Sequence, residues 1–182
     1  MRICPFDFDD IHRIRPFLEG GSQERNRRAG TESVPLVAGF AKAVEVADAR
    51  IEVDFQKAMR LKDKLSQRLT NEIDGIIVNG DKQKSIPHIL SVSFDSSVAP
   101  LDGDLLVMGM DHEGIAVTSG SACSSGSLQP SHVLLAMGRD EQTARATIRF
   151  SIGRATTESE IDFAVDALKR VAPRARAAFR KA

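Results

Sequence analysis

The chain has 182 residues, of which 25 are Lys or Arg, 25 are Asp or Glu and 42% are apolar. That length suits one domain, or one domain with part of a second. Because the opposite charges balance, net charge gives no reason to expect nucleic acid or an anionic membrane as a partner. No window approaches about 18 uninterrupted apolar residues, so the pattern predicts no transmembrane helix.

The amino-terminal stretch MRICPFDFDD has no apolar run of signal length, so we expect no secretory signal. The two cysteines, Cys4 and Cys123, are too few for a disulfide framework and lie far apart in sequence. We therefore expect a reducing compartment, the cytoplasm. Cys4 lies in an irregular stretch, and we expect no chemical role for it.

The first part of the chain combines an irregular segment with a strongly periodic one. Residues 1–33 lack periodicity and contain a Gly-Gly pair, which is typical of loops and short strand pieces. Apolar residues then recur at spacings of three and four from Val37 to Leu69, which predicts one long helix. Pro35 fits its first turn and Gly75 its end. A helix of this length is expected to bend midway or to span two packing bodies, with a coiled coil as the alternative.

Four segments are predicted as strands. GIIVNGD (75–81) runs into a turn, and ILSVSF (89–94) alternates apolar residues with serines, which indicates a half-buried strand. Only a short connection joins these two, so they are expected to pair antiparallel. IAVT (115–118) and ATIRFSI (146–152) are the further strands, the last with Ile148, Phe150 and Ile152 on one face.

Three helices are expected between and after these strands. Asp102 is positioned to cap a helix that ends at Gly114, and Ser131 to cap a short helix that stops at Gly138. A Thr-x-x-Glu capping box at 157–160 opens the last helix, which Pro173 is expected to break or bend. The order predicts a small α/β sandwich, with a sheet of three or four strands covered by helices.

Cys123 lies in SGSACSSG (119–126), a stretch of small residues. A free cysteine is more often a small buried hydrophobe than a nucleophile. Here the glycines and serines favour an open, mobile loop, which makes the thiol accessible. No Lys, Arg or His in the stretch favours the thiolate, so the activating charge must come from the fold or from a ligand.

Arg149 and the loop GGSQERNRRAGTE (20–32) are the other candidate binding elements. Arg149 alternates with apolar residues, so it projects from the face opposite the core, where a guanidinium is suited to a carboxylate; a surface charge is the alternative. The backbone amides of 20–32 and the Thr31 hydroxyl are suited to an anion such as phosphate, although the Gly-Lys-Ser/Thr end of a P-loop is absent. A plain surface loop is the alternative there. The four histidines show no ligand spacing, so we expect no permanent zinc site.

Three stretches together resemble the carboxy-terminal part of the cysteine desulfurases. They are RPFLEGGSQERNRRAGTESVP (15–35), GIAVTSGSACSSGSLQPSHVLLAMG (114–138) and IRFSIGRATTESEID (148–162). The resemblance is to the NifS/IscS-like branch, with a lean to the nitrogen-fixation type, and runs from about residue 14 to about residue 172. It implies the small carboxy-terminal α/β domain of a fold-type I pyridoxal phosphate (PLP) enzyme, with a mostly antiparallel sheet of three or four strands. The interdomain helix and this domain are expected at 34–182, and a remnant of the large cofactor-binding domain at 1–33.

The resemblance also implies roles for single residues. These enzymes are homodimers that take sulfur from L-cysteine and leave L-alanine. Cys123 matches the loop cysteine that carries the sulfur as a persulfide and contacts iron–sulfur species transiently, Arg149 the arginine that holds the substrate α-carboxylate, and Thr31 the threonine that reaches the cofactor phosphate across the dimer interface. An iron–sulfur scaffold or another sulfur acceptor is the implied partner.

The family's Schiff-base lysine, in a Ser-x-His-Lys stretch, has no match among the eight lysines of this chain. The resemblance therefore implies that the chain does not hold PLP covalently and has no desulfurase activity alone. It is expected to act as a homo-oligomer or with a missing amino-terminal half. One alternative is a non-catalytic module that accepts a persulfide or binds a partner. Another is an unrelated cysteine hydrolase, for which His132 is the nearest candidate base.

Overall fold

The computed structural model describes residues 16–82, 84–119 and 130–179. The chain divides into two compact units, Met1–Arg50 and Ile51–Ala182, and the division falls inside helix α2 (Val34–Glu72). The assignment of residues 1–33 to a larger cofactor-binding domain stays a prediction.

The described part of the first unit before α2 is an irregular segment with one turn, α1 (Gln23–Asn26). Three successive residues in this turn have positive φ: Glu24 (50°), Arg25 (56°) and Asn26 (62°). Left-handed backbone of this kind costs an ordinary residue roughly 1–2 kcal/mol, so the turn needs local support. The backbone N–H of Gly30 donates to Gln23 Oε1 at 3.1 Å and thereby closes the loop.

The predicted long helix is confirmed as α2, but the apolar residues of its stripe are buried only in the second part of the helix. Leu61, Leu65 and Leu69 are buried in the core of the second unit. Earlier in the stripe, Val37 and Phe40 are 61% and 73% exposed. The buried part is therefore anchored by packing, whereas the first part presents an unpartnered apolar face.

The sheet has three strands in the order β1 (Ile76–Val78), β2 (Ile89–Phe94) and β3 (Thr147–Ser151), and both pairs are antiparallel. This confirms the predicted fold class. The predicted strand at 115–118 is reduced to a single bridge, because only Thr118 pairs with Arg149. The preceding residues Ile115 and Val117 instead pack against the core.

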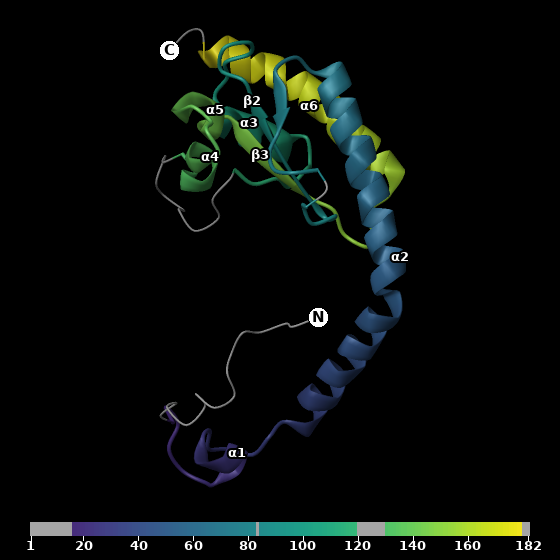
Figure 1. The fold of residues 1–182 in the computed structure, drawn as a ribbon, viewed down its shortest axis with the longest axis vertical. Helices are drawn as coiled ribbons and strands as arrows, with labels where there is room; N and C mark the ends of the chain where they lie inside the picture. Colours follow the sequence, from purple (N-terminus) through teal and green to yellow (C-terminus); the bar gives the residue numbers. More distant parts are fainter. Residues whose placement is uncertain (1–15, 83, 120–129, 180–182) are drawn as a thin grey trace. The chain divides into compact units, whose positions relative to one another are not determined.

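One face of the sheet forms the core. Leu90, Val92, Phe94, Ile148 and Phe150 point to it and are buried. Helices α3 (Gly103–His112) and α6 (Glu158–Phe179) pack on this face with the second part of α2, whereas α4 (His132–Ala136) and α5 (Glu141–Arg145) lie beside the sheet away from α2 and α6 (Figure 1). The other face carries mostly polar side chains, among them Ser91, Ser93, Thr147 and Arg149, together with Ile77 and Ile89.

The helix ends largely follow the predicted chemistry. Asp102 caps α3 by accepting from the backbone N–H groups of Asp104 (2.9 Å) and Leu105 (3.1 Å). The capping box forms, because Thr157 N–H donates to Glu160 Oε2 (2.7 Å) and Glu160 N–H donates to Thr157 Oγ1 (3.3 Å). Of the break or bend expected at Pro173, the break does not occur: α6 continues to Phe179, with buried side chains on both sides of the proline.

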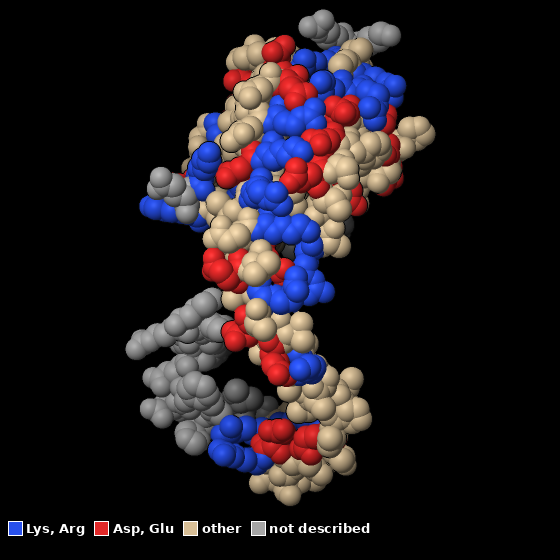
Figure 2. All heavy atoms as spheres, turned by 90° about the vertical axis from the view of Figure 1, so that its right-hand side faces the viewer, with Lys and Arg blue, Asp and Glu red and all other residues tan. Residues whose placement is uncertain are grey.

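Helices α2 and α6 are also joined by a ladder of ion pairs. Arg68 binds Asp162 (3.0 Å) and Asp166 (3.2 Å), and Lys64 binds Asp162 (2.9 Å). Glu72 bridges Arg68 (2.6 Å) and Lys169 (2.8 Å). Figure 2 shows this surface as a band of basic side chains bordered by acidic ones. No helix of the described residues has the length and apolarity needed to cross a bilayer.

Gly109 is expected to be required for the contact between α3 and α6. A Cβ at this position would lie 2.5 Å from Val171 Cγ1. We expect Gly109→Ala to lower the free energy of unfolding by about 1–3 kcal/mol through overpacking, although alanine favours a helix by about 1 kcal/mol. Urea denaturation measures it. Gly39→Ala is the matched control, since a Cβ at Gly39 would have no atom within 4 Å apart from its chain neighbours and its own helix backbone. If only Gly39→Ala lowered the free energy of unfolding, the role assigned to Gly109 would be contradicted.

The stability of the second unit is expected to fall in acid. The ion pair with Arg68 lowers the pKa of Glu72 from 4.5 to about 2, and the hydrogen bond from Lys64 lowers the pKa of Asp162. A carboxyl group whose pKa is lower in the folded than in the unfolded state stabilises the fold at any pH above its unfolded-state pKa. This stabilisation is lost as the pH falls through the folded-state pKa. Urea denaturation should therefore show a constant free energy of unfolding above about pH 5 and a decline from there to about pH 2. A rise in stability over that range would contradict it.

Candidate functional site

Four polar residues stand in one line across the sheet, on the face away from the core. Ser91 of β2 pairs with Arg149 of β3, Arg149 pairs with Thr118, and the Asn79 N–H donates to the Ser91 carbonyl at 2.9 Å. We call Asn79, Ser91, Arg149 and Thr118 the polar row. Residues in register on neighbouring strands project from the same face, so the four side chains share one surface.

Arg149 has the position that the sequence predicts. Its neighbours Ile148 and Phe150 are buried in the core, so the arginine points to the polar face. Its backbone N–H donates to the Thr118 carbonyl at 2.8 Å. Its Nε is buried, and among the described residues it has no hydrogen-bond partner. A buried donor without a partner is costly and points to a ligand that would satisfy it.

A hydrogen-bond network runs beside the polar row, and its direction is fixed. The Thr147 hydroxyl donates to the Thr143 carbonyl (3.1 Å), so it must accept from Ser93 Oγ (2.6 Å). The Ser93 oxygen then accepts from Asn79 Nδ2 (2.7 Å), which leaves Asn79 Oδ1 to accept from Arg139 Nε (3.2 Å). The directions in which the Ser93 and Thr147 hydroxyls donate and accept are therefore determined. The hydrogen-bond partners of Asn79 likewise determine which way its amide is oriented.

Sequence reasoning missed the members of this network. The alternation in 89–94 places Ser91 and Ser93 on one face, and that signal identifies the two serines. Asn79 lies in a stretch predicted only as a turn, and nothing in the sequence pattern singles out Arg139.

Cys123 lies outside the described residues, so its predicted role as a mobile nucleophile stays a prediction. Thr118, the last residue of the polar row, stands five positions before it. Thr118 is also the residue that pairs with Arg149.

Thr31 is exposed and belongs to the first unit. Arg28 lies nearby, where its Nη1 donates to the Gly30 carbonyl at 2.8 Å. Arg149, in contrast, belongs to the second unit. His132, the candidate base of the hydrolase alternative, is an exposed residue at the start of α4.

The described lysines do not fit a covalent PLP site. Lys64 and Lys169 are used in the ladder between α2 and α6, and Lys57 donates to the Arg154 carbonyl at 2.7 Å. Lys42 pairs with Glu45, and Lys82 and Lys84 are exposed. Within the described ranges no group of His, Cys, Asp and Glu has the arrangement of a metal site. The predicted iron–sulfur contact falls on Cys123, outside those ranges.

The buried Lys62 belongs to a hollow of about 420 Å³ between α2 and segment 78–91. It is 8% exposed and donates to Ser85 Oγ (2.6 Å) and the Ile86 carbonyl (2.8 Å), and burial lowers its pKa. Its bonds fasten this segment to α2. Asp63 and Asp81 also line the hollow, so its charges are mixed.

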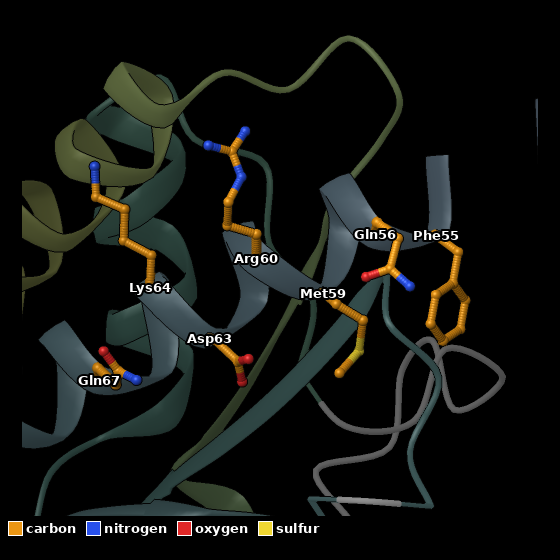
Figure 3. A pocket seen from close by; sticks show the side chains of 7 residues that line it. All are labelled: Phe55, Gln56, Met59, Arg60, Asp63, Lys64 and Gln67. Carbon is orange, nitrogen blue, oxygen red and sulfur yellow. The ribbon is translucent and has the colours of Figure 1, made fainter. Parts of the chain in front are cut away.

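A second, open hollow lies on the surface of α2, and Figure 3 shows its seven lining side chains. All come from the one helix. Arg60 binds Glu158 (2.7 Å) and Lys64 binds Asp162 (2.9 Å), so the cations are already paired with α6. The polar face of the sheet therefore remains the best candidate site.

Comparison with known proteins gives the same family as the sequence motifs. The family model described as aminotransferase class-V matches residues 13–163. A cysteine desulfurase of Trichormus azollae is 43% identical over 165 residues, which cover 91% of this chain and 40% of that protein. The human cysteine desulfurase is 40% identical over 85% of this chain and 32% of its own length.

A solved structure shows the same fold. The NifS-like protein of Rickettsia africae superposes with a TM-score of 0.70 at 26% identity, over 87% of this chain and 40% of that one. This chain thus spans about 40% of the length of the first relatives that it matches. Since the family model matches most of its residues, the chain belongs to the class-V aminotransferase family.

Proposed function

We propose that this chain supplies the small domain of a PLP-dependent cysteine desulfurase, with Cys123 as the sulfur-carrying nucleophile and Arg149 as the substrate-binding residue. The observation that carries the proposal is the buried Nε of Arg149, which has no hydrogen-bond partner among the described residues and lies on the strand that pairs with Thr118. The sequence identity to cysteine desulfurases over most of the chain supports it.

Arg149 would hold the α-carboxylate of L-cysteine. A guanidinium presents its N–H groups in a fork that matches the two oxygens of a carboxylate. The strand holds the side chain from its base, and the apolar neighbours Ile148 and Phe150 are locked in the core. A substrate bound in this way would lie beside Thr118, which stands five positions before Cys123 in the sequence.

Cys123 would accept the sulfur of the bound substrate. The reaction Cys123–SH plus L-cysteine gives Cys123–S–SH plus L-alanine. A sulfur–sulfur bond forms while the carbon–sulfur bond of the substrate breaks, and the carbon is reduced as the sulfur pair is oxidised. The persulfide then passes to an acceptor, such as a scaffold for iron–sulfur cluster or nitrogenase maturation.

PLP supplies the electron sink that such a carbon–sulfur cleavage requires. The described lysines do not offer its covalent anchor, and none of the eight lysines stands in the family's Ser-x-His-Lys stretch. The cofactor would therefore be held by residues outside these 182, with the Thr31 hydroxyl as one contact to its phosphate. The apolar residues in the first part of α2 are exposed, which suits a surface that packs against a partner. That partner would be the cofactor-holding portion or a second copy of the chain.

The 182-residue chain alone is expected to release no Cys123-dependent sulfide. Without the anchoring lysine, borohydride reduction after incubation with PLP should leave no stable cofactor adduct that depends on a single lysine. Methylene-blue sulfide assays with L-cysteine and mass spectrometry of the reduced protein test this. A lysine-bound cofactor together with sulfide release that Cys123→Ser abolishes would overturn the expectation.

Activity is expected when the chain is co-expressed with the part of the Trichormus azollae desulfurase that it does not cover. In that assembly Arg149→Gln should lower kcat/KM for L-cysteine about 100-fold, mainly through KM, because a charge-assisted carboxylate contact is lost. Arg145→Gln is the matched control, since Arg145 is exposed and pairs with Glu141 of its own helix. Equal losses in both variants would contradict the assigned role of Arg149.

A further inference from the structure

We propose that Arg139 and Arg149 together form a two-point anion site on the polar face of the sheet, which takes a small ligand with two anionic groups, such as a dicarboxylate. Arg149 binds one group, as in the function proposed above, and Arg139 binds the second. The site is a property of the chain itself and does not require cofactor or turnover.

Arg139 is held in place by the end of α4. Gly138 has φ of 83°, and its N–H donates to the Leu135 carbonyl at 2.9 Å while the Arg139 N–H donates to the Leu134 carbonyl at 3.1 Å. This pair of bonds is a Schellman motif, which fixes the residue after the glycine. The buried Leu134 side chain anchors the same helix to the protein. The backbone of Arg139 is therefore positioned independently of any ligand.

The Arg139 side chain is aimed at the polar row by Asn79. Its Nε donates to Asn79 Oδ1 at 3.2 Å, and the Asn79 amide donates to Ser91 Oγ at 3.2 Å. Ser91 is the register partner of Arg149. Hydrogen bonds thus run from Arg139 through Asn79 to Ser91, and Arg149 stands opposite Ser91 on the neighbouring strand.

The two guanidinium groups are not neutralised within the described part of the chain. Neither forms an ion pair there, and Nε of Arg149 is buried without a partner. Arg139 uses one of its five N–H donors on Asn79, which leaves its four Nη hydrogens without a partner among the described residues. Within the described residues, the neighbouring Asp140 forms no ion pair with Arg139 and caps α5, where its Oδ1 accepts from Thr143 N–H (2.9 Å) and Ser96 Oγ (3.0 Å).

The spacing of the strands determines the size of ligand. Neighbouring strands lie about 4.8 Å apart, so the backbones of Asn79 and Arg149 stand about 10 Å apart across Ser91. The side chain of Arg139 is bound at the Asn79 end of this line, and Arg149 stands at the other end. Two carboxylates on a chain of a few carbons fit between two such groups, whereas a single carboxylate engages only one of them.

The test is binding of dicarboxylates of increasing length to the purified 182-residue chain. Malonate, succinate, glutarate and adipate are titrated into the ¹⁵N-labelled protein at constant ionic strength, and the arginine Nε–H signals are followed by NMR. Acetate and propionate serve as one-carboxylate references. We expect one dicarboxylate to bind at least about ten-fold more tightly than the references, since a second charge-assisted contact forms.

Variants separate the two arginines. Arg139→Gln removes the charge but keeps a donor for Asn79 Oδ1, and it should reduce the advantage of the dicarboxylate to within about two-fold while acetate binding remains. Arg149→Gln should weaken the binding of both dicarboxylates and monocarboxylates. Arg145→Gln should leave the binding of both kinds of ligand unchanged. The absence of carboxylate binding, an equal affinity for both classes, or an unchanged dicarboxylate preference in Arg139→Gln would overturn the proposal. The desulfurase proposal survives each of the last two outcomes, because it requires one carboxylate contact at Arg149.

Discussion

The alternation of side chains along β2 and β3 is the constraint on which the candidate site depends. Because Ile148 and Phe150 are buried in the core, the residue between them has to face the other way. That residue is Arg149, and its register with Ser91 and Thr118 gathers polar groups on a face that the apolar helices do not cover. A one-residue slip of β3 would move the arginine into the core. The packing that buries Ile148 and Phe150 therefore also determines the direction of the Arg149 side chain.

The hydrogen-bond network extends this constraint from the backbone to the side chains. A hydroxyl pair buried between β2 and β3 has one consistent proton order, which ends at the Thr143 carbonyl. That order sets the Asn79 amide, and the amide in turn holds Arg139. In the buried Ser93–Thr147 pair both hydroxyl hydrogens have an acceptor, which makes this part of the network rigid, and a site that binds a small anion requires rigid support.

Most of this fold follows from local sequence patterns. Periodicity predicted α2 and β2, and the Asp102 and Thr157 caps formed as their chemistry requires. The miss at Pro173 reflects tertiary packing, which holds α6 across the proline. The helix pattern gives no reason for a glycine at position 109; the reason is tertiary, because Val171 occupies the space that a side chain there would need. Arg149 was predictable because alternation is local. Arg139 was not, since its partner Asn79 lies 60 positions away in the chain.

The central claim is that this chain provides the loop cysteine that takes sulfur from L-cysteine, beside an arginine that holds the substrate. The most direct measurement is the fate of ³⁴S-labelled L-cysteine in the assembly with a cofactor-holding portion, quenched with an alkylating agent and mapped by peptide mass spectrometry. The account predicts one labelled sulfur atom on the peptide that contains Cys123, and its loss in Arg149→Gln at low substrate concentration. Label on the Cys4 peptide, or turnover with no labelled peptide from this chain, would contradict it.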